Sequence, residues 1–159
     1  MSLTLTVSGG AKPATAKTTQ AAMPAAEWAR AVLAILERGT PRATLNQTLD
    51  GVRLGTVTRD AAAATIRRDV LAVREGQLRS ANALAAPPAS LARAERLLRR
   101  SLVLSAKADR AYIAWLEGDP AQLGRAITYS LLATSAKTRL LTALGGHGVA
   151  IPPATTTWP

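Results

Sequence analysis

The sequence contains no cysteine and no phenylalanine, and its only histidine is His147. Because cysteine is absent, disulfide bonds, thiolate zinc sites, iron–sulfur clusters and a cysteine nucleophile are excluded. A single histidine also excludes a metal site built from several histidines, and there is no Glu-x-x-His motif for a di-iron carboxylate bundle. Most of the 10 acidic residues occupy positions typical of helix caps and surface partners. The sequence therefore predicts no metal, no cofactor, no catalytic residue and no enzymatic activity.

Aromatic residues are scarce as well, with three Trp and two Tyr, so a core must be made mainly of Leu, Ala, Val and Ile. The hydrophobic share of 48% and the charged share of 19% are typical of a folded globular protein. A chain of 159 residues is long enough for one domain to bury such a core. The abundance of alanine favours helices. No run of about 18 apolar residues occurs, so we expect no transmembrane segment.

Proline and glycine divide the middle of the chain into five segments with helical periodicity. Pro24, Pro41 and Pro88 suit the first turn of a helix, where the missing N–H costs nothing. Gly39 and Gly118 suit helix ends, because glycine readily adopts the left-handed conformation found there. An acidic cap, a proline and a glutamine at residues 119–122 form a capping-box pattern at the start of the last segment. The expected helices are 24–38, 41–50, 58–85, 88–117 and 119–144.

Two tight turns join the three long helices, and short connections force neighbouring helices to run antiparallel. The sequence therefore predicts an all-α fold, an antiparallel four-helix-type bundle of three long helices and a short N-terminal helix pair. We expect a disordered tail or spacer at 1–22, the helical bundle domain at 23–145 and a Pro/Thr-rich tail at 146–159. If the opening Met-Ser-Leu is foreign to the native gene, a leader lost from in front of it would favour an extracytoplasmic location.

Apolar residues recur every three or four positions in the long helices and mark the side that is expected to face the core. In the helix at 58–85, the expected inward positions are Ile66, Val70, Val73, Gln77, Ala81 and Leu84. In the helix at 119–144, they are Leu123, Ile127, Ser130, Leu131, Thr134, Leu141 and Leu144. Lys137 lies near the edge of this second stripe, and we expect its long side chain to reach out to solvent.

Asp109 interrupts the apolar stripe of the helix at 88–117. A buried carboxylate is costly unless it is paired, so we expect Asp109 to be tied to a neighbouring helix. Counting residues from the two adjoining turns suggests its partners, which are Thr65, Arg67, Tyr129 and Ser130. The alternative is that Asp109 is an acid in a pocket, with Tyr112 and Trp115 nearby, because pockets concentrate perturbed carboxylates.

The net charge is +10, and most of the 20 basic residues are arginines. Five of them cluster on the helix at 88–117, on the side opposite to its leucines: Arg93, Arg96, Arg100, Lys107 and Arg110. Such a cluster is what the solvated face of an amphipathic helix looks like. The alternative is a face that binds nucleic acid or another polyanion, although no aromatic residues for base stacking lie between the arginines.

Residues 87–144 resemble a pattern seen in small bacterial exported proteins of unknown function, in which a helix hairpin with a Gly-Asp turn completes a bundle. This resemblance implies a bundle and carries no functional residues. The missing catalytic groups and the spacer-like N-terminus favour a non-catalytic structural or protein-interaction module, exported if a leader was lost. A protein partner is favoured over nucleic acid, and the oligomeric state stays open. A further alternative is an enzyme or a small-ligand carrier with a pocket between its helices.

Overall fold

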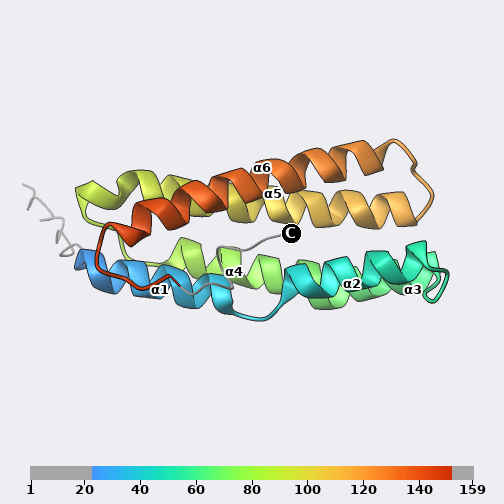
Figure 1. Ribbon diagram of the computed structural model, residues 1–159, viewed down its shortest axis with the longest axis horizontal. Coiled ribbons are helices and arrows are strands. Elements are labelled where there is room, and N and C mark those ends of the chain that lie inside the picture. The colour runs from blue at the N-terminus through green and yellow to red at the C-terminus, as the bar shows by residue number, and fades with distance from the viewer. Residues whose placement is uncertain (1–22, 152–159) are drawn as a thin grey trace, which may run out of the picture.

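In the computed structural model, which describes residues 23–151, helices lie side by side along one long axis (Figure 1). Within these residues every regular element is helical, so the predicted all-α bundle is confirmed. The elements are α1 (Ala25–Glu37), α2 (Pro41–Arg53), α3 (Arg59–Thr65), the π-helix η1 (Ile66–Leu71), α4 (Ala72–Ala83), the 3₁₀-helix η2 (Ala89–Leu91), α5 (Ala92–Leu116) and α6 (Gln122–Gly145).

The helices form two layers (Figure 1). One layer is the closely packed hairpin of α5 and α6. In the other layer, α1 and α2 follow each other along the axis beside the continuous rod of α3, η1 and α4. The predicted tail at 1–22 and residues 152–159 of the predicted C-terminal tail lie outside the described residues. Val149 and Ile151, which precede that point, pack against the core.

Polar side chains cap two of the helices where the sequence predicts starts. The Thr58 hydroxyl accepts a hydrogen bond from the Ala61 N–H at 3.2 Å at the start of α3. Before α6, the Asp119 carboxylate accepts from the Ala121 N–H at 3.1 Å and from the Gln122 side chain at 2.9 Å. The cap is therefore present, but Gln122 donates to the carboxylate of Asp119, whereas in a capping box it would accept from the backbone N–H of that residue.

The end of α1 is held by a buried amide from α4. Gln77 is 1% exposed, and its side-chain nitrogen donates to the carbonyls of Leu36 at 3.3 Å and Arg38 at 3.1 Å. Gly39 then turns the chain toward α2 with a φ of +71°, a conformation that side chains disfavour. These bonds satisfy carbonyls that the end of a helix otherwise leaves without a partner.

Two apolar clusters fill the interior, one toward each end of the bundle. The first joins α1 to the C-terminal half of α6 around Trp28, whose indole N–H donates to the Ala85 carbonyl at 3.1 Å. The second joins α2 and α3 to the C-terminal half of α5 around Leu45, Ile66 and Tyr112. Polar groups collect between them, as the next subsection describes.

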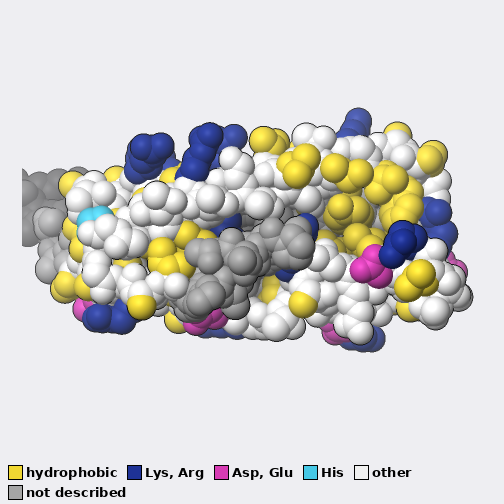
Figure 2. All heavy atoms as spheres, in the orientation of Figure 1, with side chains coloured by type: hydrophobic (Ala, Val, Ile, Leu, Met, Phe, Trp, Pro, Cys, Tyr) yellow, Lys and Arg dark blue, Asp and Glu magenta, His cyan; other side chains and the backbone are white. Residues whose placement is uncertain are grey.

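The first half of α6 presents a different side to the core from the one the periodicity predicts. Ile127 and Leu131, expected inside, are 46% and 67% exposed. The buried residues of α6 that precede Leu140 are alanines, Ala126, Ala133 and Ala136. Small side chains allow two helices to approach closely, which accounts for the tight α5–α6 pairing and for the rotation of the larger residues outward. Figure 2 shows hydrophobic side chains gathered on the surface over this half of α6.

Candidate functional site

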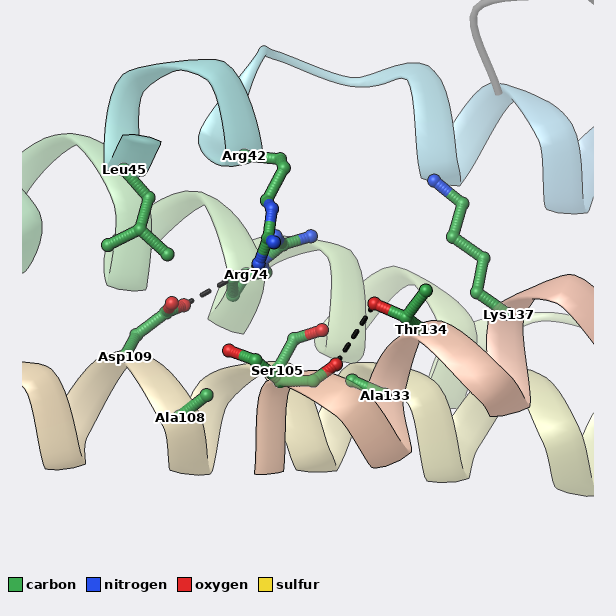
Figure 3. Close-up of a pocket in the computed structure, with 10 residues that line it drawn as sticks. Arg42, Leu45, Arg74, Ser105, Ala108, Asp109, Ala133, Thr134 and Lys137 are labelled. Carbon is green, nitrogen blue, oxygen red and sulfur yellow. Dashed lines mark hydrogen bonds and ion pairs between the residues drawn. The ribbon is translucent and has the colours of Figure 1, made fainter. Parts of the chain in front are cut away.

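A small polar cavity of about 30 Å³ lies between the two apolar clusters (Figure 3). This volume admits one or two water molecules or a polar group of similar size. Four helices contribute to it, so residues far apart in the sequence meet at one point. The lining residues are Arg42 and Leu45 from α2, Arg74 from α4, Ser105, Ala108 and Asp109 from α5, and Ser130, Ala133, Thr134 and Lys137 from α6.

The cavity has a buried base and a partly exposed rim. Arg74 and Asp109 form the base, with exposures of 9% and 1%. Arg42, Thr134 and Lys137 are half-buried and stand at the rim. Figure 3 shows Arg42 reaching from α2 toward Arg74, and Lys137 rising from α6 on the other side. The cavity therefore opens between α2 and α6, which pack less closely than α5 and α6 do.

Arg74 lies inside the bundle, shortly after a π-helical turn. The regular period predicts that Val73 follows Ile66 and Val70 on the inward side, but Arg74 is buried and Val73 is half-buried. The segment Ile66–Leu71 forms i→i+5 hydrogen bonds and so contains one extra residue in its turn. Arg74 follows this turn and belongs to a row of buried residues with Val70, Gln77 and Ala81, at spacings of four, three and four. Turns of this kind often occur at functional sites.

Arg74 and Asp109 form an ion pair without a close hydrogen bond. The Arg74 Nε and Asp109 Oδ2 atoms are 3.6 Å apart, and the two side chains are 10% and 2% exposed. Neither atom has a hydrogen-bond partner among the described residues. A buried ion pair repays the loss of hydration only when its geometry and its additional hydrogen bonds are good. The base of the cavity therefore retains polar atoms that are able to bind a further group.

Burial shifts the pKa values of three groups at this site. It raises the pKa of Asp109 from 3.8 to about 6, although the positive charges of Arg74, Arg42 and Arg110 act in the opposite direction. Burial also lowers the pKa of the Arg74 guanidinium, and Asp109 partly offsets this effect. The pKa of Lys137 is lowered from 10.5 to about 8, first by burial and then by repulsion from Arg74. The cavity is thus a place where water solvates charge poorly.

The structure places the four expected partners of Asp109 in different surroundings. Ser130 lines the same cavity. Arg67 instead forms an ion pair with Glu117 at 2.5 Å, and the Tyr129 ring faces Lys107. Thr65 is the last residue of α3 and does not line the cavity. The charged partner is Arg74, which was not among the four predicted residues.

The alternative hypothesis places Asp109 in a pocket as an acid, and Asp109 does line a cavity. The neighbours expected in that case, Tyr112 and Trp115, belong instead to the apolar cluster toward the end of α5. Lys137, expected to reach out to solvent, lies half-buried at the rim. Arg42 was not predicted as a site residue, because it does not interrupt the apolar pattern of α2 in the way that Asp109 interrupts that of α5.

The basic face of α5 is exposed. Each of its five residues has an exposed side chain: Arg93, Arg96, Arg100, Lys107 and Arg110. Arg110 pairs with Glu75 of α4 at 2.6 Å, and the Lys107 ammonium lies 5.9 Å from the centre of the Tyr129 ring. The other three form no ion pair or hydrogen bond with any residue between 23 and 151. These three arginines are thus the available part of the face.

The cavity combines basic, acidic and hydroxyl side chains. It offers three basic side chains, one carboxylate and several hydroxyls. No group of three or more His, Asp or Glu residues able to hold a metal ion is found in the described part of the chain.

In the described residues, no helix has the length and apolar character needed to cross a membrane. Comparison with family models, with curated proteins and with solved structures finds no match.

Proposed function

We propose that this protein is a non-catalytic binding module, a helical bundle that receives an anionic group of its partner in the cavity between α2 and α6. The observation that carries the proposal is the charge around the cavity. Arg42, Arg74 and Lys137 line it together with a single carboxylate, that of Asp109. Three positive charges and one negative charge in a poorly hydrated space attract an anion more strongly than the same charges in water do.

The geometry of the basic groups supports this assignment. Arginine presents a planar fork of N–H donors that matches a carboxylate or a phosphate, and charge-assisted bonds of this kind are the strong ones. Arg42 and Arg74 belong to different helices and meet at the cavity, while Ser130 and Thr134 of α6 add hydroxyl groups to its lining. Arg42 and Lys137 also make interactions of their own, so an incoming anion joins an existing network.

The size of the cavity limits what enters it. A volume of about 30 Å³ admits a carboxylate or part of a phosphate, but not a whole metabolite. The rest of the partner must therefore lie outside, on the surface of α2 and α6. This arrangement favours recognition of a terminal group over enclosure of a substrate, and it agrees with the expectation of an interaction module.

The proposal is tested by measuring the thermal unfolding of the full chain with acetate, phosphate or sulfate, each compared with chloride at the same ionic strength. A ligand at ten times its Kd stabilises the folded state by about 1.4 kcal/mol, so a specific anion raises the melting temperature. We expect Arg42→Gln to abolish this increase and the matched variant Arg93→Gln, on the exposed face of α5, to retain it. Equal behaviour of the two variants, or no effect beyond that of chloride, would contradict the proposal.

A second candidate is polyanion binding through the basic face of α5. The observation in its favour is that Arg93, Arg96 and Arg100 are exposed without partners among the described residues and follow one line along the helix. Each phosphate contact adds a slope of about −0.9 to the dependence of log affinity on log salt for duplex DNA. Replacing all three arginines with glutamine should reduce that slope by about 3. If duplex DNA and RNA do not bind at about 50 mM salt, this candidate is wrong.

A further inference from the structure

The basic cavity continues into an apolar surface on the same helix. Ile127 and Leu131 are 46% and 67% exposed, and residues four apart lie on one side of a helix. Each of them is also three residues from a residue that lines the cavity, Ser130 for Ile127 and Thr134 for Leu131. Figure 2 shows the resulting apolar surface over the N-terminal half of α6. A site for negative charge and an exposed apolar strip are therefore adjacent.

We infer that the ligand is an amphiphilic carboxylate, whose carboxylate enters the cavity beside Arg42 and Arg74 and whose alkyl chain lies along Ile127 and Leu131. The inference rests on the proposed function, because it requires that the cavity accept an anion. The cavity has room for the carboxylate alone. The alkyl chain then covers side chains that are otherwise in contact with water, and this burial is favourable in proportion to the apolar area.

An alkyl chain fits this strip better than a peptide with a free C-terminus does. The backbone groups of α6 bond within the helix, and the Thr134 hydroxyl already donates to the Ser130 carbonyl at 3.0 Å. The amides of a peptide would find few partners beside the cavity, and unsatisfied amides are costly. A hydrocarbon needs no such partners. The strip from Thr134 to Ile127 is about 10 Å long at ~1.5 Å per residue, which suits a chain of medium length.

The test is calorimetric titration of the full chain with octanoate, acetate and 1-octanol at pH 7.5 and constant ionic strength. Each methylene that is wholly or partly buried should tighten binding about two- to fourfold, so octanoate should bind at least about tenfold more tightly than acetate. 1-Octanol lacks the charge and should bind at least about tenfold more weakly than octanoate. Arg42→Gln should weaken the binding of both carboxylates.

Surface variants separate the strip from the rest of α6. The double substitution Ile127→Ser with Leu131→Ser should reduce octanoate affinity to about the level of acetate. The matched control is Leu132→Ser, because Leu132 is also exposed, at 42%, but points about 100° away around the helix. This control should leave octanoate binding unchanged.

Three outcomes would overturn the inference, and they differ in what they say of the proposed function. If acetate binds in an Arg42-dependent way and octanoate binds no more tightly, the inference fails and the proposed function stands. If an apolar peptide with a free C-terminal carboxylate binds more tightly than octanoate, the inference fails in the same way. If neither carboxylate binds, both fail.

Discussion

Replacing Asp109 with asparagine should make the protein more stable at neutral pH. The carboxylate of Asp109 is 2% exposed, and its pKa is raised from 3.8 to about 6 because burial outweighs the attraction of the neighbouring cations. This change in pKa means that ionising Asp109 costs about 3 kcal/mol more in the folded state than in the unfolded state. Asparagine keeps the shape of the side chain and removes this charge.

The sign follows from the proton balance. Between pH 3.8 and about 6 the folded chain holds a proton on Asp109 that the unfolded chain has lost, so the free energy of unfolding falls as the pH rises through this window. Relative to the wild type, Asp109→Asn should be more stable by up to about 3 kcal/mol at pH 7.5 and by about 1 kcal/mol at pH 4.5. Urea unfolding followed by circular dichroism at both pH values measures the difference.

The opposite sign would refute this reasoning. If the ion pair with Arg74 is stabilising overall, removing one partner leaves a buried charge behind and costs about 3 to 5 kcal/mol at pH 7.5. The control is Asp50→Asn, which removes an exposed carboxylate that lies 3.4 Å from Arg53, and it should change stability by less than about 0.5 kcal/mol at either pH. A pH-independent difference for Asp109→Asn would also be contrary to the account.

Three further predictions concern the same region. Arg74→Met should raise the pKa of Asp109 further, because the charge of Arg74 lowers it, so stability relative to the wild type should be lower at pH 7.5 than at pH 4.5, where Asp109 is protonated; an equal difference in urea unfolding at the two pH values would be evidence against the pairing. Gln77→Leu should cost about 1 to 3 kcal/mol in the same assay, because the carbonyls of Leu36 and Arg38 lose their donor; a change below about 0.5 kcal/mol would contradict this role. The pKa of Lys137 is lowered to about 8, so between pH 8 and 10.5 the folded chain has lost a proton that the unfolded chain still holds. The wild type should therefore gain stability relative to Lys137→Met as the pH rises through this window. A constant difference would show that Lys137 is well solvated.

The fold was predictable because its signals are local. Proline and glycine mark the helix boundaries, and the predicted helix at 41–50 differs from α2, Pro41–Arg53, by only three residues. The short turns at residues 84–88 and 117–121 then force the antiparallel order. The burial of Asp109 was also predictable, because its place in the apolar stripe of α5 depends only on helical periodicity.

The composition of the cavity was not predictable in the same way. Arg74 lies in the same buried row as Val70 and Gln77, but the sequence does not show which inward residue Asp109 of α5 meets. The exposure of Ile127 and Leu131 depends on which side of α6 packs closely against α5. Both features arise from contacts between helices, whereas periodicity describes each helix alone.

The central claim is that an anion enters the cavity between α2 and α6, and an NMR titration of the full chain with acetate at constant ionic strength tests it most directly. The account predicts saturable shifts of the side-chain Nε–H signals of Arg42 and Arg74 and of the backbone amide of Thr134, with the Arg93 and Arg96 signals unmoved. Shifts confined to Arg93 and Arg96, or shifts of all arginines in parallel that do not saturate, would contradict the claim.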